Sequence, residues 1–128
     1  MKTILVDAVD TFVSEKGEIF KEMQNLLDNY PNKKIILTGA PYERFQMYNL
    51  DKMPYEVFTL QHNPKKTDLK YYELMLSHFG FTNKDVIYFE HSKEAVKSAE
   101  AVGINTYFYD HEKKDLESLK KFLDDNLK

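Results

Sequence analysis

The sequence contains no cysteine, which excludes disulfides, thiolate nucleophiles and cysteine-based zinc sites. No run of apolar residues approaches the length needed to cross a membrane. The apolar residues 4–6 are too few to form a signal peptide and are followed at once by Asp7. These absences predict a cytoplasmic protein with no membrane partner. The histidines do not show the close paired spacing of a zinc site: His62, His78, His91 and His111.

The chain also lacks a strong charge of either sign. Eighteen Lys and Arg residues face 21 Asp and Glu residues, which gives a formal net charge of −3. Because nucleic-acid binding depends on a basic surface field, this balance argues against a nucleic-acid partner. Glycine- and serine-rich linkers, low-complexity tracts and internal repeats are missing as well. With 128 residues, 42% of them hydrophobic, the sequence predicts a single domain over residues 1–128.

Short apolar runs alternate with amphipathic stretches. Strands are predicted at residues 3–6, 35–37, 56–60, 85–89 and 104–109. Helices are predicted at residues 15–29, 41–48, 67–79, 92–102 and 116–127. Since the strands are continuous apolar runs, both faces of the sheet should be buried. The alternation predicts an α/β fold, a three-layer α/β/α sandwich around a Rossmann-like, mainly parallel five-stranded sheet.

Polar residues follow the predicted strands at the points where the strands end. Ligands of such sheets bind beyond the carboxyl ends of the strands, so these residues are the candidates for function. Together they offer a carboxylate nucleophile or metal ligand, a hydroxyl, an ammonium and an acid–imidazole pair. That set suits a phosphate group with a divalent cation. The candidates are Asp7, Asp10, Thr38, Gly39, Lys65, Lys66, Glu90 and His91.

In order and register these residues resemble the four motifs of the haloacid dehalogenase-like (HAD-like) phosphohydrolases. The first motif is a strand followed by Asp-x-Asp-x-Thr, and the second is an apolar strand that ends in Ser or Thr. The third is a Lys at the start of a helix, and the fourth is a strand with an acidic pair before a helix that ends Ala-x-x-Ala-Gly. The matching positions are Asp7 and Thr11, then Thr38, then Lys66, Asp68 and Tyr72, and finally residues 86–92 with residues 99–104.

The resemblance implies a role for each matched residue. In such enzymes the first Asp attacks phosphorus to form an aspartyl-phosphate, which makes Asp7 the nucleophile and a metal ligand. Thr38, Gly39 and Lys66 would bind the phosphoryl group, with Lys66 also counted as catalytic. Magnesium would be the cofactor. Its ligands would be Asp7, the backbone carbonyl of Val9, Glu90 and His91.

Two positions depart from the family pattern. Val9 stands where the second Asp of the first motif normally protonates the leaving group and activates water, and a valine cannot transfer a proton. Asp10, one residue later, takes that role only if the backbone shifts. His91 stands where the principal metal-binding acid is expected. Since imidazole suits zinc or another transition metal better than magnesium, His91 as a ligand would imply a different divalent metal.

The segments between the predicted strands leave no room for an inserted cap domain. An open site favours a phosphorylated small molecule or macromolecule, or a protein partner that closes the site. Two functions therefore stay open. The first is a metal-dependent phosphohydrolase with weak or altered activity through Asp7. The second is an inactive relative that binds a phosphorylated ligand or a protein. A receiver-like switch is disfavoured, because residues 61–64 after the third strand contain no Asp.

Overall fold

A parallel sheet forms the centre of the molecule. The computed structural model describes residues 1–127. The sheet has five strands in the order β3-β2-β1-β4-β5, and each neighbouring pair is parallel. This arrangement confirms the α/β prediction. The strands are β1 (Thr3–Asp7), β2 (Lys34–Thr38), β3 (Glu56–Thr59), β4 (Val86–Glu90) and β5 (Asn105–Phe108).

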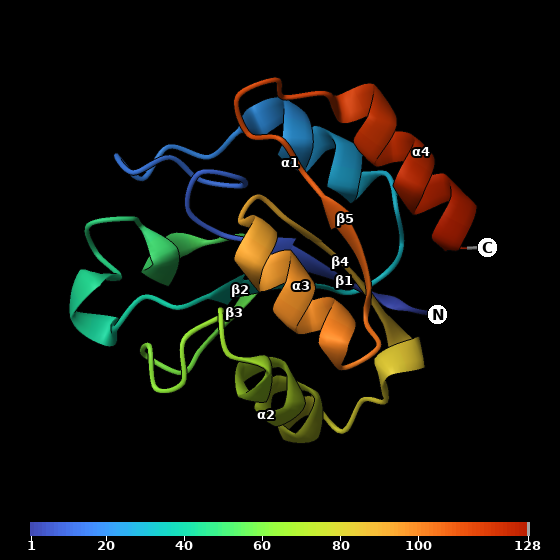
Figure 1. Cartoon of the computed structure of the whole chain (residues 1–128). Coiled ribbons are helices and arrows are strands. Elements are labelled where there is room, and N and C mark those ends of the chain that lie inside the picture. The colour runs from blue at the N-terminus through green and yellow to red at the C-terminus, as the bar shows by residue number, and fades with distance from the viewer. Residues whose placement is uncertain (128) are drawn as a thin grey trace.

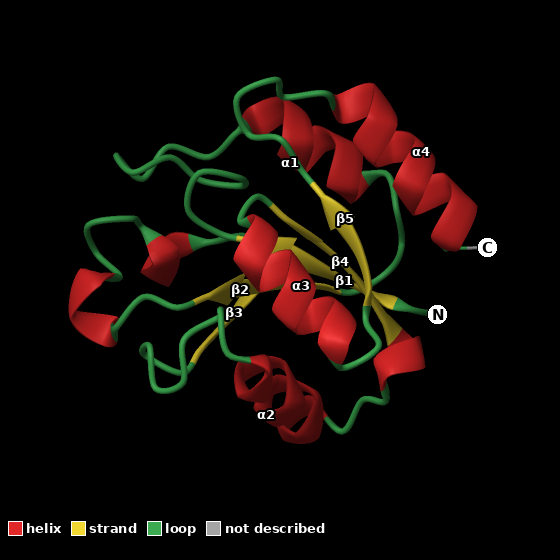
Figure 2. Cartoon of the chain, viewed as in Figure 1, coloured by secondary structure: helices red, strands yellow, loops and turns green. Residues whose placement is uncertain are grey.

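Helices cover both faces of the sheet, as Figures 1 and 2 show. The four α-helices are α1 (Lys21–Asp28), α2 (Leu69–Phe79), α3 (Lys93–Ala101) and α4 (Leu116–Asn126). Successive side chains of a strand point to opposite faces. Ile4 and Val6 of β1 accordingly pack in the core under α1 and α4, while Leu5 packs in the core under α2 and α3.

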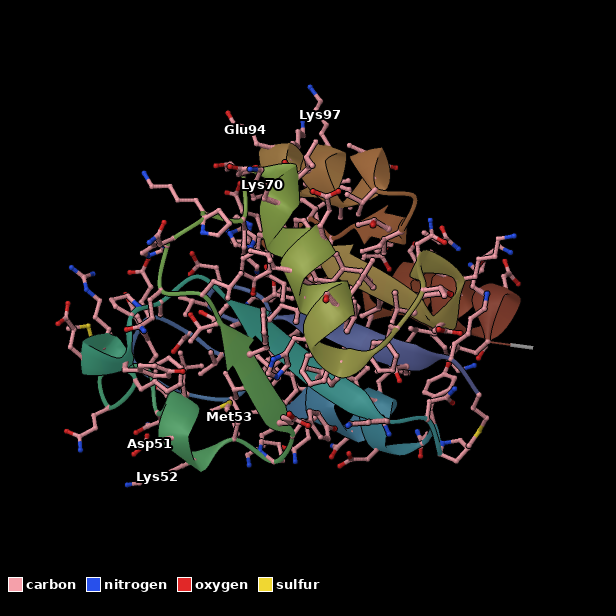
Figure 3. The ribbon with its side chains drawn as sticks, turned by 90° about the horizontal axis from the view of Figure 1, so that it is seen from below. Asp51, Lys52, Met53, Lys70, Glu94 and Lys97 are labelled. Carbon is pink, nitrogen blue, oxygen red and sulfur yellow. The ribbon has the colours of Figure 1, made fainter. Side chains whose placement is uncertain are left out.

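Helices α2 and α3 begin at side-chain caps that the sequence contains. Asp68 accepts a hydrogen bond from the backbone N–H of Lys70, and Ser92 accepts one from that of Ala95. Both caps satisfy amide groups that have no partner inside the helix. In Figure 3, Lys70, Glu94 and Lys97 mark the outer side of this helical layer and point away from the sheet. The same caps hold the loops before α2 and α3, which contribute residues to the candidate site.

One helix prediction was wrong in its starting residue, and a second was wrong altogether. The helix predicted at residues 15–29 begins only at Lys21, because residues 8–20 form a folded loop. In that loop the Ser14 hydroxyl accepts from the amides of Lys16 and Glu18, and Gly17 has φ of +82°. The segment predicted as a helix at residues 41–48 forms only a single 3₁₀ turn, Tyr42–Arg44. Short 3₁₀ turns also occur at Leu50–Lys52 and Asn83–Asp85.

The two edge strands are less buried than the sequence pattern indicated. Asn105 and Phe108 of β5 are exposed, and so is Glu56 of β3. Helix α2, by comparison, buries Tyr71, Tyr72 and Met75. In the central strands β1 and β4, all five residues of each strand are buried. The buried centre of the sheet is thus formed by β1 and β4, whose carboxyl ends lie side by side.

Candidate active site

A cavity of about 330 Å³ lies beyond the carboxyl ends of the central strands. Strand β1 lies between β2 and β4, so Asp7 at its end stands at the centre of that edge. Ligand sites of open α/β sheets normally form at such an edge. The wall of the cavity includes Asp7, Val9, Thr38, Gly39, Arg44, Tyr48, His62, Lys65, Lys66, Glu90 and His91.

Asp7 is a buried carboxylate that hydrogen-bond donors surround. Its Oδ1 accepts from the Lys66 ammonium at 2.8 Å, and its Oδ2 accepts from the Thr11 hydroxyl at 2.7 Å. The backbone N–H of His91 also donates to Oδ2, at 3.2 Å. Burial raises the pKa of Asp7, but the charge of Lys66 and the hydrogen bond from His91 lower it by more, so the net shift is well below the usual range. Asp7 is therefore ionised at neutral pH.

Lys66 joins the two acids of the site. Its Nζ lies 2.8 Å from Asp7 Oδ1 and 2.8 Å from Glu90 Oε1, and 14% of its side chain is exposed. Burial lowers the pKa of Lys66, but Asp7 and then Glu90 raise it by more, so the net shift is well above the usual value. Glu90 is held in turn by the Tyr88 hydroxyl and by the amide of Ser92. Lys66 stays charged and fixes the distance between the two carboxylates.

His91 contacts the same two acids from the other side. Its Nδ1 hydrogen-bonds Asp7 Oδ2 and lies 3.3 Å from Glu90 Oε2. The hydrogen bond to Asp7, followed by that to Glu90, raises the pKa of His91 to about 10. The ring is thus an imidazolium at neutral pH. The four groups form a closed set of two anions and two cations.

Thr38 and Gly39 form the side of the cavity nearest to β2. The Thr38 hydroxyl accepts from the amide of Ala40 at 3.1 Å, and the Tyr71 hydroxyl donates to the Thr38 carbonyl at 2.8 Å. A Cβ atom on Gly39 would lie only 2.8 Å from the ring of His62. Gly39 therefore allows His62 to approach the cavity, and Tyr71 fixes the strand end below it.

Solved structures of similar shape identify the fold. Two structures of one HAD-family enzyme from Bacteroides thetaiotaomicron have TM-scores of 0.68 and 0.66 against this chain, both at 12% sequence identity. The first is a magnesium complex, and the match covers 93% of this chain and 98% of that one. The second is an aspartate-to-alanine variant with magnesium and inorganic phosphate, with coverage of 84% and 93%.

A proposed β-phosphoglucomutase from Thermotoga maritima has a TM-score of 0.57 at 15% identity, with coverage of 84% of this chain and 85% of that one. The chain has the HAD-like fold. No protein-family model and no curated protein sequence matches the chain. Among residues 1–127, no helix is long and apolar enough to cross a membrane.

Within this HAD-like fold, most of the residues singled out from the sequence line one cavity. Asp7, Val9, Thr38, Gly39, Lys66, Glu90 and His91 all contribute to its wall. Asp10 does not. Its backbone has φ of +74°, and it lines a neighbouring cavity of about 600 Å³ together with His111. The Asp10 carboxylate lies 4.0 Å from His91 Nε2.

Sequence reasoning did not single out Arg44, Tyr48 or His62, which also line the cavity. They come from loops after β2 and β3, where no motif indicates which side chains turn inward. The sequence did contain one indication that Arg44 binds a ligand, since Arg44 is its only arginine. Arginine recognises phosphate with a planar fork of donors.

The donor set does not fit magnesium as the side chains lie. Ligand atoms of Asp7, Glu90 and His91 are all within 4.8 Å of one another, which is the layout of a metal site. However, magnesium requires near-octahedral oxygen ligands, and one of these three groups is an imidazole. Moreover, both oxygens of Asp7 and both oxygens of Glu90 already accept hydrogen bonds or face a cation.

The imidazolium of His91 should make stability depend on pH. Its pKa is about 10 in the folded chain and about 6.5 when unfolded, so its contribution is complete below pH 6.5 and is lost as pH rises through 10. We expect the free energy of unfolding of the wild type to fall between pH 7 and pH 9.5 by about 1–3 kcal/mol, the size of a hydrogen bond to a charged group. His91→Asn should lack this fall. Urea denaturation at several pH values measures the free energy of unfolding of the wild type and of His91→Asn. If this free energy changes with pH in the same way in both proteins, residue 91 is not an imidazolium.

Proposed function

We propose that the chain accepts a phosphoryl group on Asp7 from a phosphorylated ligand bound in the cavity. The observation that carries this proposal is the ionised Asp7 carboxylate, buried at the cavity wall and paired with Lys66. The cavity also has more permanent cations than anions. Arg44, Lys65 and Lys66 line it, against the carboxylates of Asp7 and Glu90. A phosphomonoester dianion suits that excess of positive charge.

In the proposed transfer, a carboxylate oxygen of Asp7 attacks phosphorus. The P–O bond to the leaving group breaks, and its electron pair stays on the leaving oxygen. The Thr38 hydroxyl, the amide of Gly39 and the Lys66 ammonium would hold the phosphoryl oxygens. Lys66 has a second role, since it keeps Asp7 ionised and aimed at the cavity.

The cavity offers no suitable side chain for the proton-transfer step. Val9 lines the cavity two residues after Asp7 and carries no proton. His91 is already protonated and hydrogen-bonded to Asp7, so it cannot accept a proton from water. Its Nδ1 proton is held by Asp7 and Glu90, and its Nε2 faces Asp10, so neither nitrogen directs a proton at a leaving group. The leaving group must therefore depart as a stable anion. This favours acyl phosphates and aryl phosphates as donors, and it predicts that the aspartyl-phosphate is hydrolysed slowly.

A second candidate is binding of a phosphorylated ligand without transfer. The observation that favours it is the crowding of Asp7 Oδ2, which accepts from the Thr11 hydroxyl and from two nitrogens of His91. An oxygen engaged by several donors is a poorer nucleophile. Both candidates use the same cavity and differ only in whether the Asp7–phosphorus bond forms.

Intact-protein mass spectrometry distinguishes the two candidates. The wild type is incubated with acetyl phosphate in the presence of EDTA and compared with Asp7→Asn. Asp51→Asn is the matched control, because Asp51 is an exposed acid that points outward in the loop between β2 and β3 (Figure 3). We expect one phosphoryl group on the wild type and on the control, and none on Asp7→Asn.

Two other outcomes of this experiment also distinguish the candidates. If no protein gains a phosphoryl group but acetyl phosphate protects the wild type against thermal unfolding, the chain binds the ligand without transfer. If acetyl phosphate neither modifies nor protects the wild type in EDTA, and does neither when the incubation is repeated in Mg²⁺, both candidates fail.

A further inference from the structure

The imidazole of His91 fills the space between the two acids of the site. Its Nδ1 hydrogen-bonds Asp7 Oδ2 and lies 3.3 Å from Glu90 Oε2. Lys66 faces the other oxygen of each acid, at 2.8 Å from Asp7 Oδ1 and 2.8 Å from Glu90 Oε1. Each carboxylate therefore has one cationic side chain on each side.

The position of the ring nitrogen fixes its proton. Nδ1 faces the carboxylates of Asp7 and Glu90, which accept hydrogen bonds and cannot donate when ionised. The Thr11 hydroxyl is also 3.3 Å away, but its hydrogen is donated to Asp7 Oδ2. Nδ1 must therefore carry a hydrogen, whether or not Nε2 does. A metal ion binds the lone pair of a ring nitrogen, and a protonated Nδ1 has none to offer. In this orientation His91 donates a hydrogen bond to the two acids and does not ligate a metal ion together with them.

The carboxylate oxygens are also occupied. Asp7 Oδ2 accepts from the Thr11 hydroxyl at 2.7 Å and from the His91 amide at 3.2 Å, in addition to the ring. Glu90 Oε2 accepts from the Ser92 amide at 3.0 Å. An oxygen has about two lone-pair directions, so Asp7 Oδ2 has none left for a cation.

Neighbouring groups hold the ring in this orientation. The Thr11 hydroxyl lies 3.3 Å from Nδ1, and the Asp10 carboxylate lies 4.0 Å from Nε2 on the far side of the ring. The ring of His111 packs edge-on against that of His91, with 4.9 Å between the ring centroids. Rotating Nδ1 away from the acids would disturb all three contacts.

We infer that His91 takes the place of a divalent cation between Asp7 and Glu90, so that this site works without a metal. The inference stands on the hydrogen bonds of the four side chains. Only its extension to phosphate binding rests on the proposed function. It departs from the sequence-based expectation that Asp7, Val9, Glu90 and His91 ligate a divalent metal.

Metal titration tests the inference without any phosphorylated ligand. Binding of Mn²⁺ is followed by electron paramagnetic resonance, and binding of Co²⁺ by its visible absorption. The proteins are the wild type, His91→Asp, and His91→Asp combined with Asp7→Asn. We expect no saturable site in the wild type. We expect His91→Asp to gain a saturable Mn²⁺ site, with an affinity at least about tenfold above any residual binding by the wild type, the usual size of an effect from groups around a metal. The double variant should lose that gain.

Three results would overturn the inference. One is a saturable Mn²⁺ or Co²⁺ site in the wild type that Asp7→Asn removes. Another is a folded His91→Asp protein with no gain in Mn²⁺ affinity. If His91 replaces a cation, an acid at position 91 should restore the cation site. If His91→Asp does not fold, His91→Asn replaces it, and no gain in that protein counts equally against the inference.

The third result comes from titrating the wild type with inorganic phosphate in EDTA and in Mg²⁺. Equal affinities support a metal-free site, and binding only with Mg²⁺ contradicts it while leaving the proposed function intact. Absence of phosphate binding in both buffers contradicts the proposed phosphate site, whereas the metal titrations decide the role of His91 by themselves.

Discussion

Lys66→Met should lower the free energy of unfolding at pH 7 by about 3–5 kcal/mol, the usual cost of removing one partner from a buried ion pair. Lys66 is the shared partner of Asp7 and Glu90, of which only 4% and 1% of the side chains are exposed. Methionine keeps the length of the side chain but leaves both acids without their ammonium. The remaining cation, His91, contacts only one oxygen of each acid.

The control for this prediction is the adjacent lysine. Lys65 lines the same cavity but is exposed, and Lys65→Met should change stability by less than about 0.5 kcal/mol. Urea denaturation at pH 7 measures both variants. Near pH 4 the loss in Lys66→Met should be smaller, because protonation relieves an unpaired buried acid. Equal losses in the two variants would mean that Lys66 does not hold the acids together.

Val9→Asp should accelerate breakdown of the phosphorylated protein by about 10²–10⁴-fold, the usual contribution of general acid–base catalysis. Val9 lines the cavity beside Asp7, so a carboxylate at this position can take a proton from the attacking water. In its protonated form the same side chain can protonate a leaving group, so alkyl phosphates should become substrates. Release of phosphate from the acetyl-phosphate-treated protein, followed over time in EDTA, measures the first effect.

Val9→Asn provides the comparison, because asparagine has the shape of aspartate but cannot transfer a proton. It should leave the rate of phosphate release near that of the wild type. Similar rates for Val9→Asp and Val9→Asn would show that proton transfer is not the missing step, and the slow step would have to lie elsewhere, for instance in the crowded oxygen of Asp7.

The sequence predicted the parts of the site that depend on strand ends. Asp7, Thr38 and Glu90 each end a buried parallel strand, and parallel strands bring their carboxyl ends to one edge. Lys66 was placed by its position ahead of a helix. These relations depend on chain order and on the period of apolar residues, both of which can be read without coordinates.

Other parts depended on contacts between distant residues. Asp10 could take the proton-transfer role only through a shift of the backbone, and with φ of +74° it lines the neighbouring cavity instead. Residues 15–20 continued a helical pattern, yet the Ser14 and Gly17 turn stops the helix from starting there. The ring of His62 lies where a Cβ atom on Gly39 would come within 2.8 Å of it. No local pattern reports on such pairs.

The role of His91 illustrates the same limit. The family resemblance placed it at the position of a metal ligand, and its chemistry permitted that role. We infer a different role from the direction of the ring, because Nδ1 is turned toward two carboxylates. The sequence supplied the residue and the neighbourhood, whereas the direction of one ring nitrogen determines whether the residue binds a cation or substitutes for it.

The most direct test of a metal-free phosphoryl acceptor is phosphorus NMR of the wild-type protein with acetyl phosphate in excess EDTA. We expect a protein-bound acyl-phosphate resonance that hydroxylamine removes and that Asp7→Asn never forms. A resonance that appears only after Mg²⁺ is added in excess of the chelator would contradict a metal-free acceptor, and one that persists in Asp7→Asn would contradict Asp7 as the acceptor.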